Sequence, residues 1–445
     1  MATKPELIWR KRIADTETPV SAALKLFVPE RGDFILESVE GGEARGRHSL
    51  IGIAPDLVFR AAGDRAEINS QWMTDRTAFA PSPLSSLDAL RALAADCRMD
   101  VPEELPPALA CLVGYFGYET IGLVEKLPRA PQSALELPDM LFVRPTVILV
   151  FGAVPVSEER EIKLTPVLPE GRYAQMVASA KDYIEAGDIF QVVLAQRFTA
   201  PFDLPPVHLY RALRRINPSP FLYFIDLPGF ALIGSSPEIL VRARGGEVTI
   251  RPIAGTRPRG KSSIEDAENR ASLLADPKER AEHLMLLDLG RNDVGRVTKG
   301  GSVTVTDSYM VEFYSHVMHI VSNVVGELAD DKDAIDALFA GFPAGTVSGA
   351  PKVRACEIIA ELEPETRGAY AGGVGYFSPN GDMDSCIVLR TGIVKDGVLH
   401  VQAGAGIVAD SNPEYEQREC EAKAGALIAA AREAFRVAGE AKFGQ

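Results

Sequence analysis

Two pairs of glutamates have a spacing that suits a divalent cation. Glu279 and Glu282 stand three residues apart, and so do Glu416 and Glu419. If each pair lies on a helix, both of its carboxylates share one helical face. Four carboxylates from two helices offer the oxygen ligands that Mg²⁺ takes in proteins. Charge pairs with this spacing are also common on solvated helices, and Glu279 can complete a capping box that Asp276 begins. Spacing alone therefore favours solvated charge pairs or a helix cap over a metal site.

Three further features suit an anionic ligand, and each also has a plainer interpretation. Glycines at 404 and 406 interrupt a strand-like run, which indicates the close approach of a ligand or of another backbone, or else a bulge or tight packing within the sheet. Arg390 stands in an apolar stretch, where it can grip a carboxylate or pair with a neighbouring aspartate, Asp382 or Asp384. His319 can act as a general acid, although a lone histidine is more often structural.

Two polar loops share the sequence Ala-Gly-Thr, at residues 252–260 and 342–352. Neither has the glycine-to-lysine spacing of a phosphate-binding loop. They serve either as connections or as walls of a site. The chain also has no Gly-x-Cys-x-Gly elbow, so we do not expect it to hydrolyse glutamine.

The composition narrows the classes of partner. The chain has 445 residues, of which 46% are hydrophobic and 24% charged, and its formal charge is -14. An acidic chain without a basic block is an improbable partner for nucleic acid. A site for an anion must therefore supply its own local cations or backbone N–H groups. Five scattered cysteines, a polar N-terminus and the lack of a long apolar run predict a cytoplasmic protein with reduced thiols and no membrane contact.

The pattern of elements predicts an α+β fold with largely antiparallel sheets. Strand-like segments fall within residues 34–59, 110–116 and 142–151, with a helix at 85–99 between them. Pro155 to Gly171 reads as a linker. After it, helices are expected at 173–186, 276–289 and 413–435, and strands at 190–198, 221–225, 231–235, 239–242, 373–377, 385–394 and 399–408. Residues 316–325 and 353–362 are expected to be structured, without a preference for helix or strand. Asn380-Gly381 predicts a tight hairpin turn.

Six long motifs, in order over residues 173–430, resemble the chorismate-utilising enzymes. They are GDIFQVVLAQRF (187–198), PIAGTRPRG (252–260), ERAEHLMLLDLGRNDVGRV (279–297), FPAGTVSGAPKVRACEII (342–359), YAGGVGYFSPNGDMDSCIVLRTG (370–392) and VQAGAGIVADSNPEYEQRECEAKA (401–424). In addition, FILESVEGGEARGRHSLIG (34–52) is similar to the regulatory region of the anthranilate synthase component I branch. The resemblance thus covers nearly the whole chain.

The resemblance implies a fold, a metal and a set of site residues. The fold is α+β, with antiparallel sheets packed as a sandwich and helices on the outside. Mg²⁺ is bound by Glu282 and Glu419, with Glu279 and Glu416 nearby through water, and assists loss of the ring hydroxyl. The resemblance assigns catalysis to His319, Thr346 and Glu279. It assigns chorismate binding to a larger set: Gly255, Thr256, Tyr370, Arg390, Gly404, Ala405 and Gly406.

Two positions select the reaction within the family. Relatives that form isochorismate or salicylate carry a lysine where this chain has Gln191, and aminodeoxychorismate synthases commonly carry a lysine where it has Ala254. The resemblance therefore implies amination of chorismate by ammonia, followed by elimination of pyruvate to leave anthranilate, the first step of tryptophan biosynthesis. The alternatives are an aminodeoxychorismate synthase component I and a non-catalytic tryptophan-sensing paralogue. A glutamine amidotransferase subunit would supply the ammonia, within a heterotetramer.

The resemblance also implies feedback inhibition by tryptophan. Residues 1–155 would form the regulatory region and residues 172–437 the chorismate-binding domain. A site that bridges the two can bias a two-state closure. The residues expected to hold tryptophan are Leu36, Glu37, Ser38, Ser49, Pro220, Phe221 and Leu222. On their own, these segments can also be no more than a strand end and a turn.

Overall fold

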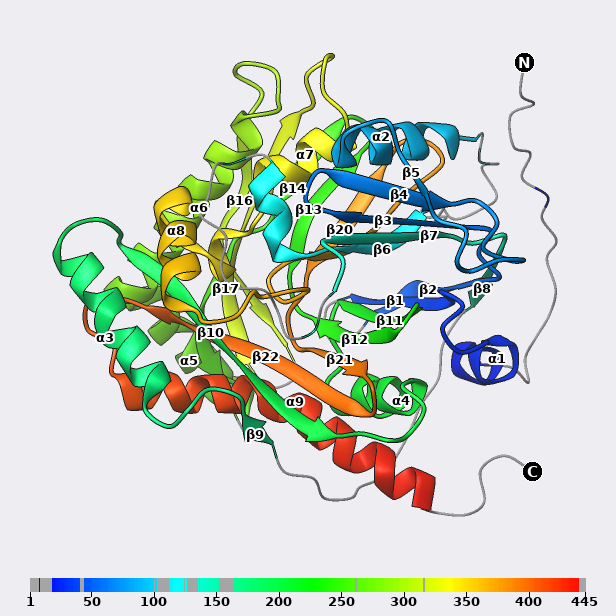
Figure 1. Ribbon diagram of the computed structural model, residues 1–445. Helices are drawn as coiled ribbons and strands as arrows, with labels where there is room; N and C mark the ends of the chain where they lie inside the picture. The colour runs from blue at the N-terminus through cyan, green and yellow to red at the C-terminus, as the bar shows by residue number, and fades with distance from the viewer. Residues whose placement is uncertain are drawn as a thin grey trace.

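Two antiparallel sheets packed face to face form the body of the molecule (Figure 1). The structure is a computed structural model, and it describes residues 8, 18–40, 44–99, 101, 112–123, 125, 135, 137–151, 164–260, 262–314 and 317–439. Side chains are described for these residues except 38–40, 44–48, 151 and 436–439. The expected linker, Pro155 to Gly171, is described only from Leu164 onward.

The first sheet joins strands from both ends of the chain. Its order is β18-β10-β22-β21-β12-β11-β1-β2-β8, with β9 paired to β10. Its strands are β1 (Phe34–Glu40), β2 (Ala44–Ile53), β8 (Val147–Phe151), β9 (Thr165–Pro166), β10 (Gln191–Pro201), β11 (Phe221–Leu227), β12 (Phe230–Ser236), β18 (Gly349–Ala350), β21 (Thr391–Lys395) and β22 (Val398–Ile407).

The second sheet has the order β15-β17-β14-β13-β20-β19-β6-β7-β3-β4-β5, with β16 paired to β17. Its strands are β3 (Leu57–Ala62), β4 (Arg65–Asn69), β5 (Ala80–Pro81), β6 (Leu112–Phe116), β7 (Met140–Arg144), β13 (Ile239–Arg244), β14 (Glu247–Ile250), β15 (Ile253–Pro258), β16 (Thr304–Phe313), β17 (Val317–Glu327), β19 (Gly373–Phe377) and β20 (Met383–Ile387). The N-terminal region thus contributes strands to both sheets.

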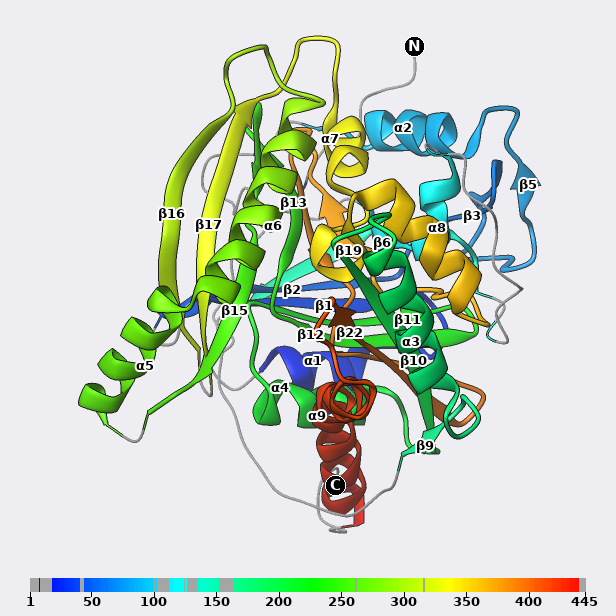
Figure 2. The same cartoon turned by 90° about the vertical axis from the view of Figure 1, so that its left-hand side faces the viewer.

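Helices cover the outer faces of the sandwich, as Figures 1 and 2 show. Helices α4 and α9 pack together and lie against the first sheet, while α6 crosses β15 and β17 of the second. The helices are α1 (Pro19–Leu26), α2 (Ser86–Asp96), α3 (Arg172–Glu185), α4 (Val207–Ile216), α5 (Ser263–Ala275), α6 (Pro277–Gly295), α7 (Ala334–Gly341), α8 (Lys352–Leu362) and α9 (Pro413–Gly439), with 3-10 turns η1 (Tyr118–Leu123) and η2 (Gly345–Val347). The α+β sandwich predicted from the sequence is confirmed.

Apolar side chains from both sheets meet in a core between them. Phe34 and Tyr223 of the first sheet pack in the same cluster as Tyr115 and Val143 of the second. A larger cluster fills the spaces beneath the helices and includes the buried face of α9. Burying such side chains is the main stabilising contribution in a fold of this size.

The expected strand Ser385–Val394 is wrong in one respect, because it is two strands in two sheets. β20 belongs to the second sheet and β21 to the first, and the chain crosses between them at Val388 to Arg390. Arg390 has φ +48°, a conformation that non-glycine residues adopt rarely. A uniform apolar pattern cannot reveal this break, since both halves are buried strands.

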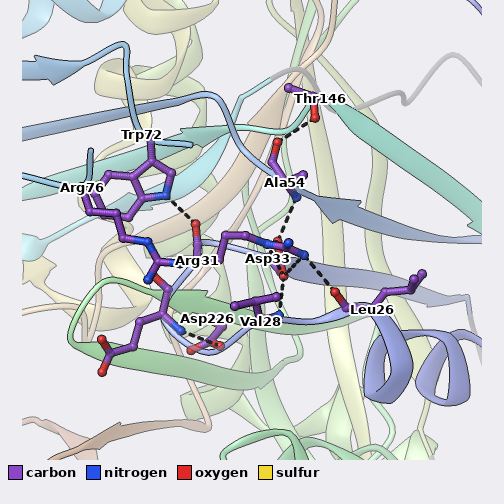
Figure 3. Close-up of polar contacts among 10 residues, drawn as sticks. Leu26, Val28, Arg31, Asp33, Ala54, Trp72, Arg76, Thr146 and Asp226 are labelled. Atoms are coloured by element: carbon purple, nitrogen blue, oxygen red, sulfur yellow. Dashed lines mark hydrogen bonds and ion pairs between the residues drawn. The ribbon is translucent and has the colours of Figure 1, made fainter. Parts of the chain in front are cut away.

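The loop between α1 and β1 is tied down by the buried carboxylate of Asp33 (Figure 3). Asp33 accepts hydrogen bonds from the backbone N–H groups of Val28 and Ala54, and it pairs with Arg31 at 2.7 Å. The indole of Trp72 donates to the Arg31 carbonyl at 2.7 Å. These contacts fix where β1 begins.

Two expectations about the chain's environment can be compared with the structure. Cys97, Cys356, Cys386 and Cys420 are buried and form no disulfide with another described residue, whereas Cys111 lies outside the described residues. Within the described part of the chain, none of the helices has the length and hydropathy needed to cross a bilayer.

Candidate active site

The two glutamate pairs lie on the first two turns of α6 and α9. Asp276 caps α6 by accepting hydrogen bonds from the N–H groups of Lys278 and Glu279, as the sequence predicts. Burial raises the pKa of Glu282, and the nearby charges of Glu279 and Glu419 raise it further. The charge of Glu419 on α9 therefore acts on Glu282 of α6. The prediction that the two helices contribute carboxylates to one site requires such proximity.

Basic side chains hold these carboxylates in this conformation. Arg257 contacts Glu279 at 3.1 Å, so Glu279 does not fold back to complete a capping box. Lys423 contacts Glu419 at 2.7 Å and donates to the Gly404 carbonyl at 2.9 Å. Among the described side chains, no three acidic, histidine or cysteine residues are close enough together to ligate one ion. The all-oxygen donor set and the mutual repulsion at Glu282 nevertheless fit a hard divalent cation.

The glycines of β22 lie where other side chains approach the strand closely. A Cβ on Gly404 would stand 2.7 Å from the Tyr370 hydroxyl, and one on Gly406 would stand 2.6 Å from Gln191 Nε2. β10 and β22 run side by side without a register shift, so the alternative of a bulge is wrong. Ala405 is buried on the opposite face of β22 and presents only its backbone.

Gln191 lies between this glycine strand and the carboxylates of α6. Its side chain opposes the rise in the pKa of Glu282. Gln191 is 6% exposed, and its Oε1 has no partner among the described residues. A buried amide oxygen without a partner is costly, which marks this position as one built for a ligand.

His319, Thr256 and Gly255 meet where β15 pairs with β17. His319 Nδ1 lies 3.0 Å from the Gly255 carbonyl and 3.1 Å from the Thr256 hydroxyl. Because a carbonyl only accepts, we assign the proton to Nδ1, which leaves Nε2 free to act as a base. Burial lowers the pKa of His319, so the ring is neutral at neutral pH. Gly255 has φ +71°, and a Cβ there would stand 2.9 Å from the Glu279 carboxylate.

Arg390 reaches the same region from the crossover between the sheets. It makes no ion pair with any acidic side chain that the structure describes. Asp384 pairs instead with Arg242 and Arg244, so the ion pair considered from the sequence is wrong for Asp384. Burial lowers the pKa of Arg390, which still lies far above neutral pH. A partly buried guanidinium without a carboxylate partner suits an anionic ligand.

Glu238 is a residue of this site that the sequence reasoning missed. It stands at the start of β13, is 8% exposed, and accepts a hydrogen bond from Thr346 at 2.9 Å. Burial raises its pKa to about 8, while Thr346 and Arg390 act in the opposite direction. At neutral pH it is a carboxylic acid with a proton to give. The available signal was a lone acid ahead of the apolar run Ile239–Val241.

The residues expected to bind tryptophan are brought together by strand register. β1 lies between β2 and β11, with Glu37 opposite both Ser49 and Leu222 and with Ser38 opposite Phe221. Glu37 is 7% exposed and is bonded to Ser49, Tyr210 and Arg214. Its side chain points toward α4, whereas the preceding Leu36 packs toward the core between the sheets. The turn at Pro220 leads directly into β11, and the side chain of Ser38 lies outside the described part.

Comparison with known proteins agrees with this geometry. The family model described as "chorismate binding enzyme" matches residues 152–429. Anthranilate synthase component 1 of Cereibacter sphaeroides is 49% identical, over 97% of this chain and 96% of that one. The Thermus thermophilus protein of the same name is 45% identical, over 94% and 96%. The crystal structure of anthranilate synthase component I from Streptococcus pneumoniae superposes with a TM-score of 0.76 at 33% identity, covering 95% of this chain and all of that one.

Proposed function

We propose a role for each residue of the candidate active site in one reaction. This chain belongs to the chorismate-binding enzymes. As an anthranilate synthase component 1, it makes anthranilate from chorismate in tryptophan biosynthesis. The observation that carries the proposal is the approach of Glu282 to Glu419 across two helices, beside the glycine strand and Gln191.

We propose Mg²⁺ as the metal, held by Glu282 and Glu419 with Glu279 and Glu416 close by. When bound, it supplies charge neutralisation for the carboxylate of chorismate and for the departing ring oxygen. Arg257 pairs with Glu279 and Lys423 with Glu419, and both ion pairs would have to open for these carboxylates to ligate the ion.

The remaining groups fit a dianion. Arg390 offers a guanidinium for one carboxylate, and the backbone of Gly404, Ala405 and Gly406 offers polar groups for the other end of the molecule. Tyr370 adds a hydroxyl beside Gly404. Gly255 and Thr256 of β15 contact the ring of His319 on the neighbouring strand β17 and line the same site.

Glu238 is suited to protonate the leaving hydroxyl. As ammonia forms its bond to the ring, the ring hydroxyl departs with a proton from Glu238 and becomes water. The new ammonium nitrogen then loses a proton, so atoms and charge balance. Thr346 orients the Glu238 carboxyl, and positioned acids of this kind contribute about 10²- to 10⁴-fold in rate. His319 Nε2 then removes the ring proton as the bond between the ring and the enolpyruvyl oxygen breaks. The departing enolpyruvate takes up one proton and becomes pyruvate, which leaves anthranilate.

Two positions favour ammonia as the nucleophile. Gln191 and Ala254 have no amine with which to activate water or attack the ring. We propose that a glutamine amidotransferase subunit supplies the ammonia, in a heterotetramer. The name "component 1" of the relatives implies a second component, and this chain has no glutamine-hydrolysing elbow.

We also propose tryptophan as a feedback inhibitor. It would bind at Leu36, Glu37, Ser38 and Ser49 together with the Pro220–Leu222 segment. Since β1, β2 and β11 are neighbours within the sheet that carries β10 and β22, a ligand there can shift the strands that line the active site.

The test is direct. The protein is incubated with chorismate, Mg²⁺ and ammonium at high pH, and anthranilate is followed by its fluorescence. We expect anthranilate and pyruvate in equal amounts. Accumulation of aminodeoxychorismate or isochorismate in place of anthranilate would overturn the assignment.

A further inference from the structure

Glu238 and Thr346 also line a small cavity between α6, η2 and strands β13 to β15. The centres of water-sized molecules can move through about 30 Å³ of it, which is room for about two waters. Most of its remaining walls are apolar, with Ile250, Leu286 and Leu289 among them. The cavity is therefore too small for an organic ligand.

Asp293 of α6 stands on the wall of the same cavity. It pairs with Lys352 of α8 at 2.8 Å, and both side chains are about nine-tenths buried. Thr346 and Arg251, which pairs with Glu312, also line the cavity. Glu238 and Asp293 therefore stand among several polar groups that a short chain of ordered waters can contact.

The proposed reaction creates a need for such a chain. After giving its proton to the leaving hydroxyl, Glu238 is a carboxylate that is 8% exposed, a form that burial disfavours. It must regain a proton before the next turnover. The nearby cation, Arg390, has none to spare at neutral pH.

We propose that waters in this cavity return the proton to Glu238, with Asp293 as the positioning residue at the far end of the chain. For each proton that enters the water chain from solvent beside Asp293, one proton is delivered to Glu238 at the other end. The proton lost by the newly bonded nitrogen leaves to solvent, so the cycle balances. This inference rests on the acid role proposed for Glu238.

The test fills the cavity from Ala344, which lines it without belonging to the reactive groups. Ala344→Leu places a larger apolar side chain where the waters would stand, whereas Ala344→Ser keeps most of the space and adds a hydroxyl. Anthranilate formation is measured with saturating ammonium, in H₂O and in D₂O. We expect Ala344→Leu to lower kcat about tenfold with the chorismate KM unchanged, and to increase the solvent isotope effect on kcat. Ala344→Ser should behave like the wild type.

Asp293→Asn gives a second measurement, because it keeps the size of the side chain and removes its charge. We expect the same fall in kcat and the same increase in the isotope effect, with substrate binding preserved. Unchanged kcat in Ala344→Leu, or a lower kcat without a larger isotope effect, would overturn the relay.

A further arm separates the relay from a passage for ammonia, which is also water-sized. If Ala344→Leu impairs only turnover driven by glutamine and the partner subunit, the cavity carries ammonia and the relay is wrong. Failure of the wild-type protein to make anthranilate would instead remove the proposed function itself, whatever the variants do.

Discussion

Glu238 should make the folded protein less stable as the pH rises, and Glu238→Gln should remove that effect. The ordinary pKa of a glutamate is 4.5, and burial raises that of Glu238 to about 8. Between these values the unfolded chain loses the Glu238 proton while the folded protein keeps it. The contribution of Glu238 to the free energy of unfolding is therefore complete below about pH 4.5 and is lost progressively as the pH rises toward 8.

The size of the effect follows from the two pKa values. Each unit of difference is worth about 1.4 kcal/mol, so the full loss is about 5 kcal/mol. Between pH 5.5 and pH 8 the loss grows by about 3 kcal/mol. With about 2.1 cal/mol/K of unfolding entropy per residue over 445 residues, this corresponds to about 3 °C in Tm.

The measurement is calorimetric unfolding of both proteins at several pH values. We expect the Tm of Glu238→Gln to rise relative to that of the wild type by about 3 °C between pH 5.5 and 8. Any constant offset caused by the altered hydrogen bond with Thr346 cancels in this trend. Glu247→Gln, an exposed change on neighbouring β14, is the control and should show no trend.

Activity should move in the opposite direction. Glu238→Gln removes the proton that the leaving hydroxyl needs, and we expect kcat to fall by about 10²-fold or more. A Tm difference that is independent of pH would mean that Glu238 is ionised in the folded protein. That result would refute both its raised pKa and its role as an acid.

The remaining predictions concern the metal, the inhibitor site and the buried ion pair. Glu419→Gln should weaken Mg²⁺ binding, measured by titration calorimetry, by at least about tenfold, and a variant with unaltered affinity would exclude Glu419 as a ligand. Ser38→Phe should abolish inhibition by tryptophan and keep activity, and inhibition at the wild-type level would remove the proposed inhibitor site. Arg367 is 2% exposed and pairs with Glu363 at 2.6 Å. Arg367→Met should cost about 3–5 kcal/mol of unfolding free energy in urea denaturation, against about 1 kcal/mol or less for Arg60→Met, whose side chain is only partly buried in its pair with Glu67.

Most helices and strands were predictable because their periodicity is local. The first turn of α6 follows from Asp276-Pro277, and the β19–β20 hairpin follows from Asn380-Gly381, which the structure confirms. The α+β class follows from the order of such elements. Others were missed: α4 is short, and α5 and β16 are largely exposed and carry little apolar pattern.

The composition of the active site depended on a different kind of information. The order of the motifs indicated which residues belong together, since six long matches in sequence are specific. The type and setting of Arg390 indicated a carboxylate-binding role but not its place at the crossover between the sheets. Glu238 looked like one acid among many.

The family could thus be identified from the sequence alone, because each motif is a run of consecutive residues and can be recognised without the fold. The pKa values of those residues depend on contacts between segments that are distant in the sequence, so only the tertiary structure determines them. The pKa of Glu238 is raised because β13, η2 and the crossover at Arg390 enclose it, and burial costs a charge its solvation. Glu282 senses Glu419 because α6 and α9 converge, although 136 positions separate the two residues along the chain.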